Sequence, residues 1–575
     1  MLVKGIAAAP GIAIGKAYVW ESGGWPLAAN VVETAEPENE LRKLNEAVML
    51  AENDLDRLRE MTEKELGPEQ AGIFAAHLAF LSDPMFVGEI RRIVSTKKIT
   101  AESAVGKVAA SLIEMFRAID DEYLRERALD VKDVSQKLIG MLNGVSAGGL
   151  SSLAGPAILI AHDIAPSDAA QFPPGVVLGM AMAAGGKTSH SAILARARNI
   201  PAAVGLGAAL FDLVKPGDLL ILDGTAGELI IAPDDEVLRR YQKRQAKEAE
   251  RAKQLEQLRE LPAVTQDGFV AELAVNIGKP DEVPDGIEKG AQGVGLFRTE
   301  YLYMDREQFP TEEEQAEAYR QAAELAQGRP VVIRTLDIGG DKRLTYFALP
   351  QEANPFLGWR ALRIGLEKTE LLLTQIKAVL RASAFGKIRL MLPMVSHVEQ
   401  IQAAKRLIAQ AKSELFAAGV PFDDNLEVGV MIEIPAAAII AEQLAQEADF
   451  FSIGTNDLVQ YTLAVDRMNE KVAPLCDYFH PAVLRLIDLI IRASERSGIR
   501  ASMCGEMAGD PLAAPLLVGL GLKEWSMSAN AIPQVKEAIR RTNRERAKRL
   551  AAQILRMATA EEVRSALREF AGAAE

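Results

Sequence analysis

The sequence has 575 residues and a net charge of −14, and 49% of its residues are apolar and 25% charged. This composition is typical of a globular protein, and the length is too great for one hydrophobic core. The acidic balance argues against a nucleic-acid partner but allows a basic protein partner, and two cysteines are too few for a disulfide framework and favour a reducing compartment. The first residues lack the unbroken apolar core of a signal peptide, and no apolar run is long enough to cross a bilayer. We therefore expect a cytoplasmic protein without membrane insertion, and the length predicts two to four domains.

The two ends of the first 233 residues contain short β-type runs that are bounded by Gly and Pro. These runs are residues 11–20, 156–164, 175–183, 218–224 and 227–233. They predict a small α/β domain that is split in the sequence into residues 1–34 and 141–233.

Residues 35–140 separate the two halves of this domain and have a helical pattern. Apolar residues recur there at alternating steps of three and four, which indicates a coiled-coil-like seam: Leu41, Leu44, Val48, Ala51, Leu55 and Leu58. We therefore expect an inserted helical bundle. Its 21 acidic and 15 basic residues leave it net acidic. The charge alone does not distinguish a solvated surface from a docking face for a basic protein.

Residues 234–262 form the predicted link to the second half of the chain. From Asp235 to Leu261, 14 of 27 residues are charged and neither Gly nor Pro occurs. Such a segment predicts a helix of about 40 Å. We expect this helix to be too polar for burial and to bridge two domains.

Residues 263–575 alternate β-type runs with helical stretches. Eight such runs predict a (β/α)₈ TIM barrel: residues 270–278, 293–300, 330–337, 388–395, 427–435, 449–457, 500–507 and 523–529. The predicted fold class is therefore multidomain α/β, with a split N-terminal domain, an inserted bundle, a linker helix and a C-terminal barrel.

Polar side chains follow the apolar part of the predicted barrel strands, where TIM barrels have their active sites. They are Asn276, Arg298, Arg334, Glu433, Asn456, Asp457, Cys504 and Ser526. Arg360 and Arg467 could join Arg298 and Arg334, since the guanidinium fork matches phosphate or carboxylate. For any single arginine, a structural pair with Asp or Glu is an equal alternative, but the whole set favours binding of an anion.

Two carboxylates and one thiol complete the predicted barrel site. Glu433 and Asp457 end consecutive strands, so both could reach one Mg²⁺, which typically takes one or two carboxylates, waters and substrate oxygens. Beside the arginines they favour a phosphorylated, carboxylated small substrate. Cys504 is either an inert buried side chain or a proton donor, because an ordinary thiol is protonated at pH 7. Cys476 lies outside any strand end and is interpreted as structural.

His190 is one of five histidines and follows a Gly-Gly pair at the start of an apolar helical pattern. Ser189 or Thr188 could cap this helix. A helix N-terminus offers free N–H donors, which disfavour imidazolium and favour an added phosphate. A structural role for a single helix-start histidine remains the alternative, and the predicted phosphate-binding barrel favours a nucleophile.

Four long motifs then allow a comparison with known families. Residues 185–205, GGKTSHSAILARARNIPAAVG, resemble the phosphohistidine motif of phosphoenolpyruvate-utilising enzymes. Three other stretches resemble their barrel signatures: GVGLFRTEYLYMDR, NPFLGWRALRIGL and FFSIGTNDLVQYTLAVDR. The order of the parts resembles the enzyme I family of the bacterial sugar phosphotransferase system over nearly the whole chain.

This resemblance implies a phosphoenolpyruvate–protein phosphotransferase. In such an enzyme phosphoenolpyruvate binds with Mg²⁺ at the barrel mouth and phosphorylates Nε2 of His190, and Cys504 protonates the remaining enolate to give pyruvate. The phosphoryl group then passes to a histidine of the carrier protein HPr, which docks on the inserted bundle (35–140), as the first step of sugar uptake. The barrel domain forms a homodimer, and the domain with His190 moves between the barrel and the carrier.

The resemblance also implies roles for the other barrel residues. Arg298, Arg334 and Arg467 hold the substrate with Arg360 nearby, Asn456 contacts the phosphate, and Glu433 and Asp457 bind Mg²⁺. One position departs from the family pattern: residue 169 is Ala, where family members often have a threonine that hydrogen-bonds the active histidine. Thr188 or Ser189 could orient His190 instead, or its orientation is looser. Lys187 stands where an arginine is common and keeps the charge.

Three other kinds of protein are alternatives to this function. Pyruvate phosphate dikinase and phosphoenolpyruvate synthase share the histidine domain and barrel, but they also need an ATP-binding domain, and the insert has no Gly-rich phosphate loop. A regulatory phosphocarrier or scaffold without catalysis is disfavoured because all the expected barrel residues are present. A nitrogen-signalling paralogue usually has an additional N-terminal sensory domain.

Overall fold

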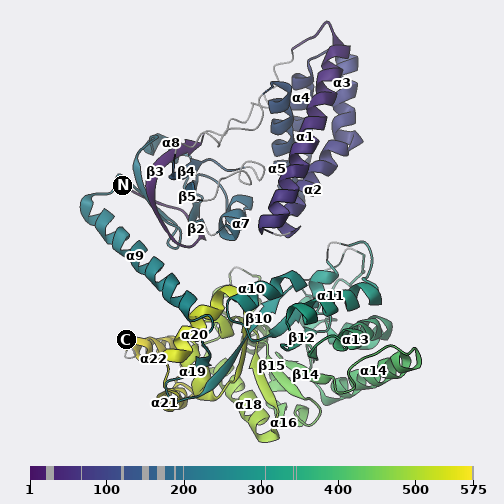
Figure 1. Ribbon diagram of the computed structural model, residues 1–575, viewed down its shortest axis with the longest axis vertical. Coiled ribbons are helices and arrows are strands. Elements are labelled where there is room, and N and C mark those ends of the chain that lie inside the picture. The colour runs from purple at the N-terminus through teal and green to yellow at the C-terminus, as the bar shows by residue number, and fades with distance from the viewer. Residues whose placement is uncertain are drawn as a thin grey trace. The chain divides into compact units, whose positions relative to one another are not determined.

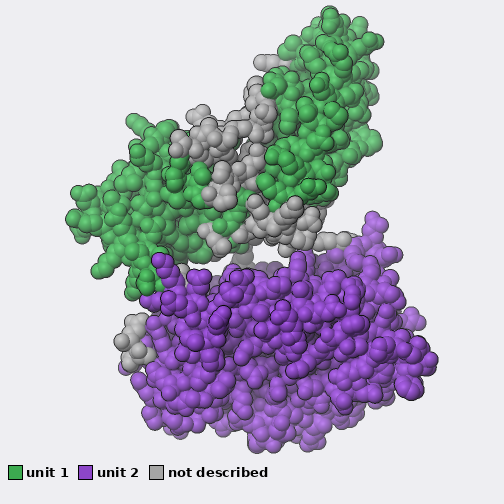
Figure 2. Space-filling view, in the orientation of Figure 1, with its two compact units in different colours: residues 1–250 green, residues 251–575 purple. Residues whose placement is uncertain are grey.

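The computed structural model describes residues 1–572 except 21–31, 67, 118–121, 145–154, 165–174, 187–188, 199, 305, 341, 343, 345 and 470. The chain divides into two compact units, Met1–Glu250 and Arg251–Glu575, coloured green and purple in Figure 2. The division falls inside the long helix α9, Asp235–Gln257.

The first unit contains an eight-stranded sheet with the order β1-β8-β7-β3-β4-β5-β6-β2 (Figure 1). Its strands are β1 (Leu2–Lys4), β2 (Ile6–Ala9), β3 (Ile12–Trp20), β4 (Ala157–Ala161), β5 (Val177–Met182), β6 (Ala202–Val204), β7 (Leu219–Asp223) and β8 (Glu228–Ile231). Strands β3 to β6 are parallel, and the remaining neighbours pair antiparallel. The five predicted strands are present. The sequence did not indicate β1, β2 and β6, which have only three or four residues each, too few to show a pattern.

The helices of the first unit include the predicted insert. They are α1 (Pro37–Leu66), α2 (Pro68–Ser82), the π-helix η1 (Pro84–Gly88), α3 (Glu89–Lys97), α4 (Ala101–Arg117), α5 (Glu122–Leu142), α7 (His190–Ala197) and α8 (Leu210–Leu213). In α1 the predicted seam is a buried stripe, because Leu44, Leu55 and Leu58 are 0% exposed, and Leu41 is half-buried. The seam packs into one apolar core with side chains of α2 to α5, including Phe74, Ile90, Val105 and Leu138.

Among the described residues, no single helix has the length and apolar composition to cross a membrane. One bent pair, Gly72–Ser82 with Pro84–Lys97, meets both criteria together. Phe74, Leu81 and Ile90 of this pair are at most 3% exposed and belong to the bundle core.

Most described residues of helix α9 are exposed, as expected for a charged segment, but one of its faces packs against the sheet. Tyr241 is only 5% exposed and packs with Ile12 and Ile221 of the sheet. Gln245 Nε2 also donates to the carbonyl oxygen of Ile12 at 2.8 Å. One face of the helix is therefore attached to the sheet of the first unit, and the helix ends at Gln257.

The second unit is a closed barrel of eight parallel strands, which confirms the predicted fold class. They are β10 (Val270–Ile277), β11 (Val294–Arg298), β12 (Val331–Arg334), β13 (Ile388–Leu392), β14 (Glu427–Ile432), β15 (Phe450–Ile453), β16 (Arg500–Met503) and β17 (Glu524–Met527). Pairing of β10 with both β11 and β17 closes the barrel. The short strand β9 (Ala263–Val264) adds an antiparallel pair to β10. Each predicted run contains one of these eight strands.

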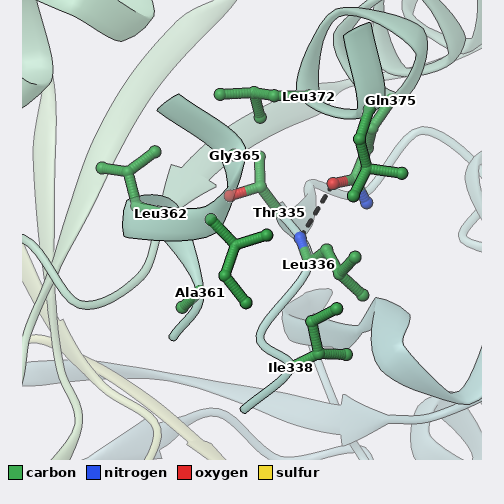
Figure 3. Close-up of a pocket in the computed structure, with 10 residues that line it drawn as sticks. Thr335, Leu336, Ile338, Ala361, Leu362, Gly365, Leu372 and Gln375 are labelled. Atoms are coloured by element: carbon green, nitrogen blue, oxygen red, sulfur yellow. Dashed lines mark hydrogen bonds between the residues drawn. The ribbon is translucent and has the colours of Figure 1, made fainter. Parts of the chain in front are cut away.

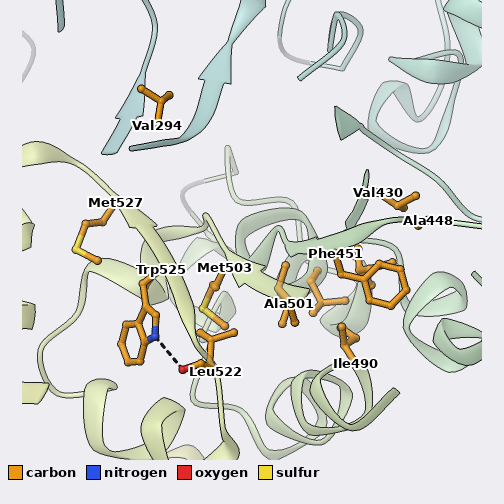
Figure 4. Packing of buried hydrophobic residues seen from close by; sticks show 14 of the residues in the cluster. Val294, Val430, Ala448, Phe451, Ile490, Ala501, Met503, Leu522, Trp525 and Met527 are labelled. Carbon is orange, nitrogen blue, oxygen red and sulfur yellow. Dashed lines mark hydrogen bonds between the residues drawn. The ribbon is translucent and has the colours of Figure 1, made fainter. Parts of the chain in front are cut away.

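Helices surround the barrel (Figure 1). They are α10 (Val283–Glu288), α11 (Glu312–Leu325), α12 (Leu362–Glu367), α13 (Thr369–Ser383), α14 (Val398–Ala417), α15 (Pro435–Ile439), α16 (Ala441–Leu444), α17 (Thr455–Leu463), α18 (Pro481–Ser497), α19 (Ala514–Leu520), α20 (Ile532–Arg541), α21 (Arg544–Ile554) and α22 (Ala560–Gly572). The core lies between strands and helices (Figure 4), where Phe451 faces Ile490 of α18 and the indole N–H of Trp525 donates to the Leu522 carbonyl oxygen at 3.1 Å.

Candidate active site

The ends of the barrel strands place most predicted site residues at one mouth of the barrel. Arg298 and Arg334 are the last residues of β11 and β12, and Glu433 and Cys504 directly follow β14 and β16. The predicted strand 449–457 is shorter in the structure, because β15 ends at Ile453 and α17 begins at Thr455. Asn456 and Asp457 therefore lie in the first turn of α17 rather than on a strand.

Arg334 belongs to a buried group of charges. Its Nη2 donates to Glu300 Oε1 at 2.7 Å, and its Nη1 lies 3.1 Å from Asp337 Oδ2. Lys342 Nζ also reaches Glu300 Oε1 at 2.7 Å and Asp337 Oδ2 at 3.1 Å. Burial alone would raise the pKa of Glu300, but Arg334 and Lys342 outweigh this effect and lower it. Glu300 and Asp337 thus hold the side chains of Arg334 and Lys342 in place.

Arg360 connects this group to α17. Its side chain is 0% exposed, and its Nε donates to Asp337 Oδ1 at 3.0 Å while its Nη1 donates to Asp457 Oδ1 at 3.1 Å. The hydroxyl of Tyr461 lies 3.3 Å from the same Nη1. A charge this deep in a protein persists only with such partners. Among the predicted arginines, Arg360 is therefore held by carboxylates on two sides.

Arg298 differs from these two arginines. Within the described part of the chain, its half-buried guanidinium has no hydrogen bond or ion pair. Arg467 is intermediate, since its Nη1 lies 3.8 Å from Asp457 Oδ1 and about a quarter of its side chain is exposed. The mouth thus contains two guanidinium groups that are paired with carboxylates, Arg334 and Arg360, and two, Arg298 and Arg467, that have more hydrogen-bonding capacity left for an anion.

Glu433 is the carboxylate with the most unusual environment. It is 1% exposed and its Oε1 accepts from the backbone N–H of Met394 at 2.6 Å. Burial, followed by repulsion from Asp457 and Asp337, raises the pKa of Glu433 to about 8. A cation bound beside Glu433 and Asp457 would offset the repulsion between the two carboxylates. The donor set of Glu433 and Asp457 therefore fits Mg²⁺.

No group of three or more His, Cys, Asp or Glu side chains that could hold a metal ion occurs among the described residues.

Cys504 lies inside the barrel and is 3% exposed. Its apolar neighbours come from five different strands: Leu296, Val332, Met391, Met431 and Phe450. Burial raises the pKa of the thiol, while a hydrogen bond from Ser452 and the charge of Arg334 oppose the rise. The thiol therefore keeps its proton at neutral pH, as a proton donor requires. Asn456 lies nearby, where its Oδ1 accepts from the backbone N–H of Glu506 at 2.9 Å.

A different part of the chain places His190. Helix α7 begins at this residue, and Ser189 is its N-cap: the Oγ accepts from the backbone N–H of Ala192 and donates to the Gly186 carbonyl oxygen at 2.9 Å. The structure thus identifies Ser189 as the cap. Lys187, Thr188 and Ala169, and the side chain of His190, lie outside what the structure describes.

A cavity lined by residues that follow β12 and by residues of α12 and α13 has a different character. Figure 3 shows it between Leu336, Ile338, Ala361 and the start of α13, where the side-chain oxygen of Gln375 accepts from the Leu336 backbone N–H at 2.8 Å. Its lining is mostly apolar: Leu336, Ile338, Ala361, Leu362, Ile364, Gly365, Leu371 and Leu372, with Thr335 and Gln375. Because it lacks cationic side chains, it does not suit an anionic substrate.

Comparison with known proteins now adds to this geometry. Models of phosphoenolpyruvate-utilising enzymes match three segments: the N-terminal domain at residues 4–127, the mobile domain at 153–227 and the phosphoenolpyruvate-binding domain at 252–544. The phosphoenolpyruvate-protein phosphotransferase of Geobacillus stearothermophilus is 46% identical over 98% of this chain and 96% of its own length. That of Bacillus subtilis (strain 168) is 44% identical over 99% of both chains. The chain belongs to the phosphoenolpyruvate-protein phosphotransferase family.

The predicted resemblance is thereby confirmed. Among solved structures, the NMR solution structure of Enzyme I (nEIt) is 38% identical and covers 43% of this chain and 99% of its own, with a TM-score of 0.37. In this phosphotransferase-family chain, the segment matched by the phosphoenolpyruvate-binding domain contains all the charged residues described above at the barrel mouth.

Four residues of this mouth were missed by the sequence analysis: Glu300, Asp337, Lys342 and Ser452. Glu300 follows Arg298 by two positions, and Asp337 follows Arg334 by three. An acidic residue soon after a strand-ending arginine is a signal that could have found both. Lys342 and Ser452 have no such signal, because their contacts depend on how the barrel closes.

Proposed function

We propose that this protein is a phosphoenolpyruvate–protein phosphotransferase that transfers the phosphoryl group of phosphoenolpyruvate to its own His190. The observation that supports this most directly is the barrel mouth, where four guanidinium groups, two close carboxylates and one buried thiol meet in a chain of this family. A phosphorylated enol of a carboxylic acid needs all three kinds of group. Its two anionic groups need cations, and its carbon needs a proton.

The proposed roles of the four arginines differ because their hydrogen-bond partners differ. Arg298 and Arg467, which have free hydrogen-bonding capacity, bind the phosphate and carboxylate of the substrate, with Asn456 on the phosphate. Arg334 and Arg360 are fixed by Glu300, Asp337 and Asp457. They therefore present positive charge without reorganising, which lowers the barrier when charge shifts during transfer.

Glu433 and Asp457 would hold Mg²⁺. The bound ion supplies positive charge that neutralises the phosphate and the developing enolate oxygen. Burial, and then repulsion from Asp457 and Asp337, raises the pKa of Glu433, and a cation at this place would offset the repulsion.

The transfer leaves an enolate that must be protonated. The bond between phosphorus and the enol oxygen breaks while a bond to Nε2 of His190 forms. Cys504 then gives its S–H proton to the methylene carbon, so a C–H bond forms and the electron pair of the S–H bond stays on sulfur. The products are pyruvate and a thiolate that recovers its proton from water.

The remaining assignments follow from the family. We infer that phosphohistidine transfers its phosphoryl group to a histidine of the carrier HPr as the first step of sugar uptake. The acidic composition of the helical insert supports its role as the docking site for that carrier. A homodimer formed through the barrel and a cytoplasmic location are further proposals that rest on the same family resemblance.

Labelling with phosphoenolpyruvate tests the proposal. The purified chain, incubated with labelled phosphoenolpyruvate and Mg²⁺ and without nucleotide, is expected to acquire one acid-labile label that peptide mapping assigns to His190. His190→Ala should acquire none. Absence of label on the wild-type chain would exclude the function, and a requirement for nucleotide would favour a dikinase or synthase.

The two chemical steps can be separated with Cys504→Ala. This variant is expected to form phosphohistidine while pyruvate appears about 10²- to 10⁴-fold more slowly, the range that a general acid contributes. Cys476→Ala is the matched control, because Cys476 is the second thiol of the chain and is not part of the mouth. Equal loss of labelling and pyruvate formation would refute the role of Cys504.

A further inference from the structure

A buried serine contacts the thiol that the proposed mechanism uses. Ser452 lies in β15, is 0% exposed, and its Oγ donates to Cys504 Sγ across 3.2 Å. Its strand and β16, which precedes Cys504, are neighbours, and Ser452 pairs with Ser502 in the register. No other hydrogen bond of the Ser452 hydroxyl occurs among the described residues. The sulfur is therefore the partner of an otherwise unsatisfied buried hydroxyl.

The direction of this hydrogen bond determines what the thiol can do. Since the hydroxyl donates to a sulfur lone pair, the S–H proton of Cys504 is not consumed by Ser452. The other polar atom near the sulfur is the Ile453 carbonyl oxygen at 3.8 Å, a long distance for a weak donor. The proton is thus available to a carbon atom at the barrel mouth.

The backbone of Cys504 is fixed as well. Asn276 Nδ2 donates to the Cys504 carbonyl oxygen at 3.0 Å, and the Ser526 hydroxyl donates to Asn276 Oδ1 at 2.6 Å. The Cys504 N–H donates to the Ile453 carbonyl oxygen at 3.1 Å. Hydrogen bonds from β10 and β15 therefore hold the residue from both sides, and among the described residues Ser452 alone contacts the sulfur with a side-chain donor.

We propose that Ser452 is a positioning residue for the protonation step, whose hydroxyl orients the Cys504 thiol and stabilises the thiolate that remains. This inference rests on the proposed function, since it requires Cys504 to protonate the enolate. A hydrogen bond to a charged acceptor is stronger than one to a neutral acceptor. The Ser452 hydroxyl therefore interacts more strongly as negative charge develops on sulfur, and an interaction of that kind accelerates a step.

The surroundings increase the importance of this single donor. The side chains around the sulfur are apolar, and they include Leu296, Met391 and Met431. Water is thus a poor source of compensation for a thiolate at this place. Ser452 does not change which bonds break and form: the proton moves from sulfur to carbon, and the serine keeps its own proton.

Ser452→Ala tests the inference, with Ser502→Ala as the matched control. Ser502 is also a buried serine, 8% exposed, on the neighbouring strand, but its hydroxyl donates to the Phe451 carbonyl oxygen at 3.1 Å and not to the thiol. Single-turnover experiments with phosphoenolpyruvate would follow phosphohistidine and pyruvate separately. We expect Ser452→Ala to form phosphohistidine at close to the wild-type rate and pyruvate about tenfold more slowly, while Ser502→Ala changes neither.

Two further variants make the result decisive. Ser452→Thr retains the hydroxyl and should restore pyruvate formation, which a role in packing alone would not predict. In a Cys504→Ala background, Ser452→Ala should have no additional effect, because the two side chains act as one unit. The inference is overturned if Ser452→Ala matches Ser502→Ala, or if it loses both steps together.

The failure of the inference differs from the failure of the proposed function. If Cys504→Ala slows pyruvate formation but Ser452→Ala does not, the thiol is the proton donor and the serine is irrelevant to it. If Cys504→Ala leaves pyruvate formation unchanged, the proton-donor assignment itself is wrong.

Discussion

The barrel mouth and the start of α7 are the two regions where we propose that this protein has its reactive groups, and they are built on different scales. At α7 the described hydrogen bonds of Ser189 reach Gly186 and Ser191, three and two positions away. At the mouth Arg360 is bonded to Asp337 and Asp457, 23 and 97 positions away. One site depends on a local turn and cap, whereas the other exists only when the barrel closes.

This difference predicts how each region responds to substitution. Arg334, Arg360 and Asp337 at the mouth are buried and paired, so removal of one charge leaves another with fewer partners. The cap of α7 is partly exposed, so water can replace much of what a substitution removes. Substitutions at the mouth should therefore have larger effects than those at the helix start.

Arg360→Ala should show the largest effect on stability. It removes one partner from each of the buried carboxylates Asp337 and Asp457, and breaking a buried ion pair in this way typically destabilises by about 3–5 kcal/mol. The free energy of unfolding of the second unit, from calorimetry or denaturant titration, measures the loss. Arg492→Ala, which removes an exposed pair with Asp488, should change it by at most about 1 kcal/mol. Equal effects of the two variants would contradict the contrast.

Arg298→Ala separates binding from stability at the same mouth. Because this guanidinium has no partner in the described part of the chain, we expect its loss to change the free energy of unfolding by less than about 1 kcal/mol. Labelling of His190 by phosphoenolpyruvate should fall about 10²- to 10³-fold, as when one preorganised donor is removed from a charged transition state. Arg298→Lys keeps the charge but not the fork and should recover part of the activity. A destabilisation as large as that of Arg360→Ala would show that Arg298 is structural.

How much of each region could be predicted follows from the same difference in scale. The strands of the barrel were predictable because each is an apolar run between polar turns, and the helix start was predictable from Gly-Gly and Ser189. Arg298 and Arg334 were found because they end strands.

The carboxylate partners of Arg334 and Arg360 were not found from the sequence. A carboxylate such as Asp337 becomes a partner of Arg360 only through the closed barrel, and nothing in a linear pattern shows a contact over 23 positions. The contact between Ser452 and Cys504, 52 positions apart, is invisible for the same reason. The sequence thus indicated which groups meet at the mouth, but not how the charges are paired.

Ser189→Ala should have the smallest effect and would define the lower limit of the comparison. It removes the side chain that caps α7, so the four free N–H groups at the helix start lose one acceptor, and a lost cap typically destabilises by about 1 kcal/mol. The unfolding transition of the first unit measures this change, and Ser189→Thr, which keeps an acceptor, should recover most of it. Ser189 directly precedes His190, where α7 begins. A much larger loss of stability, or a loss of labelling without a loss of stability, would therefore show that Ser189 interacts with the reacting imidazole rather than with the helix alone.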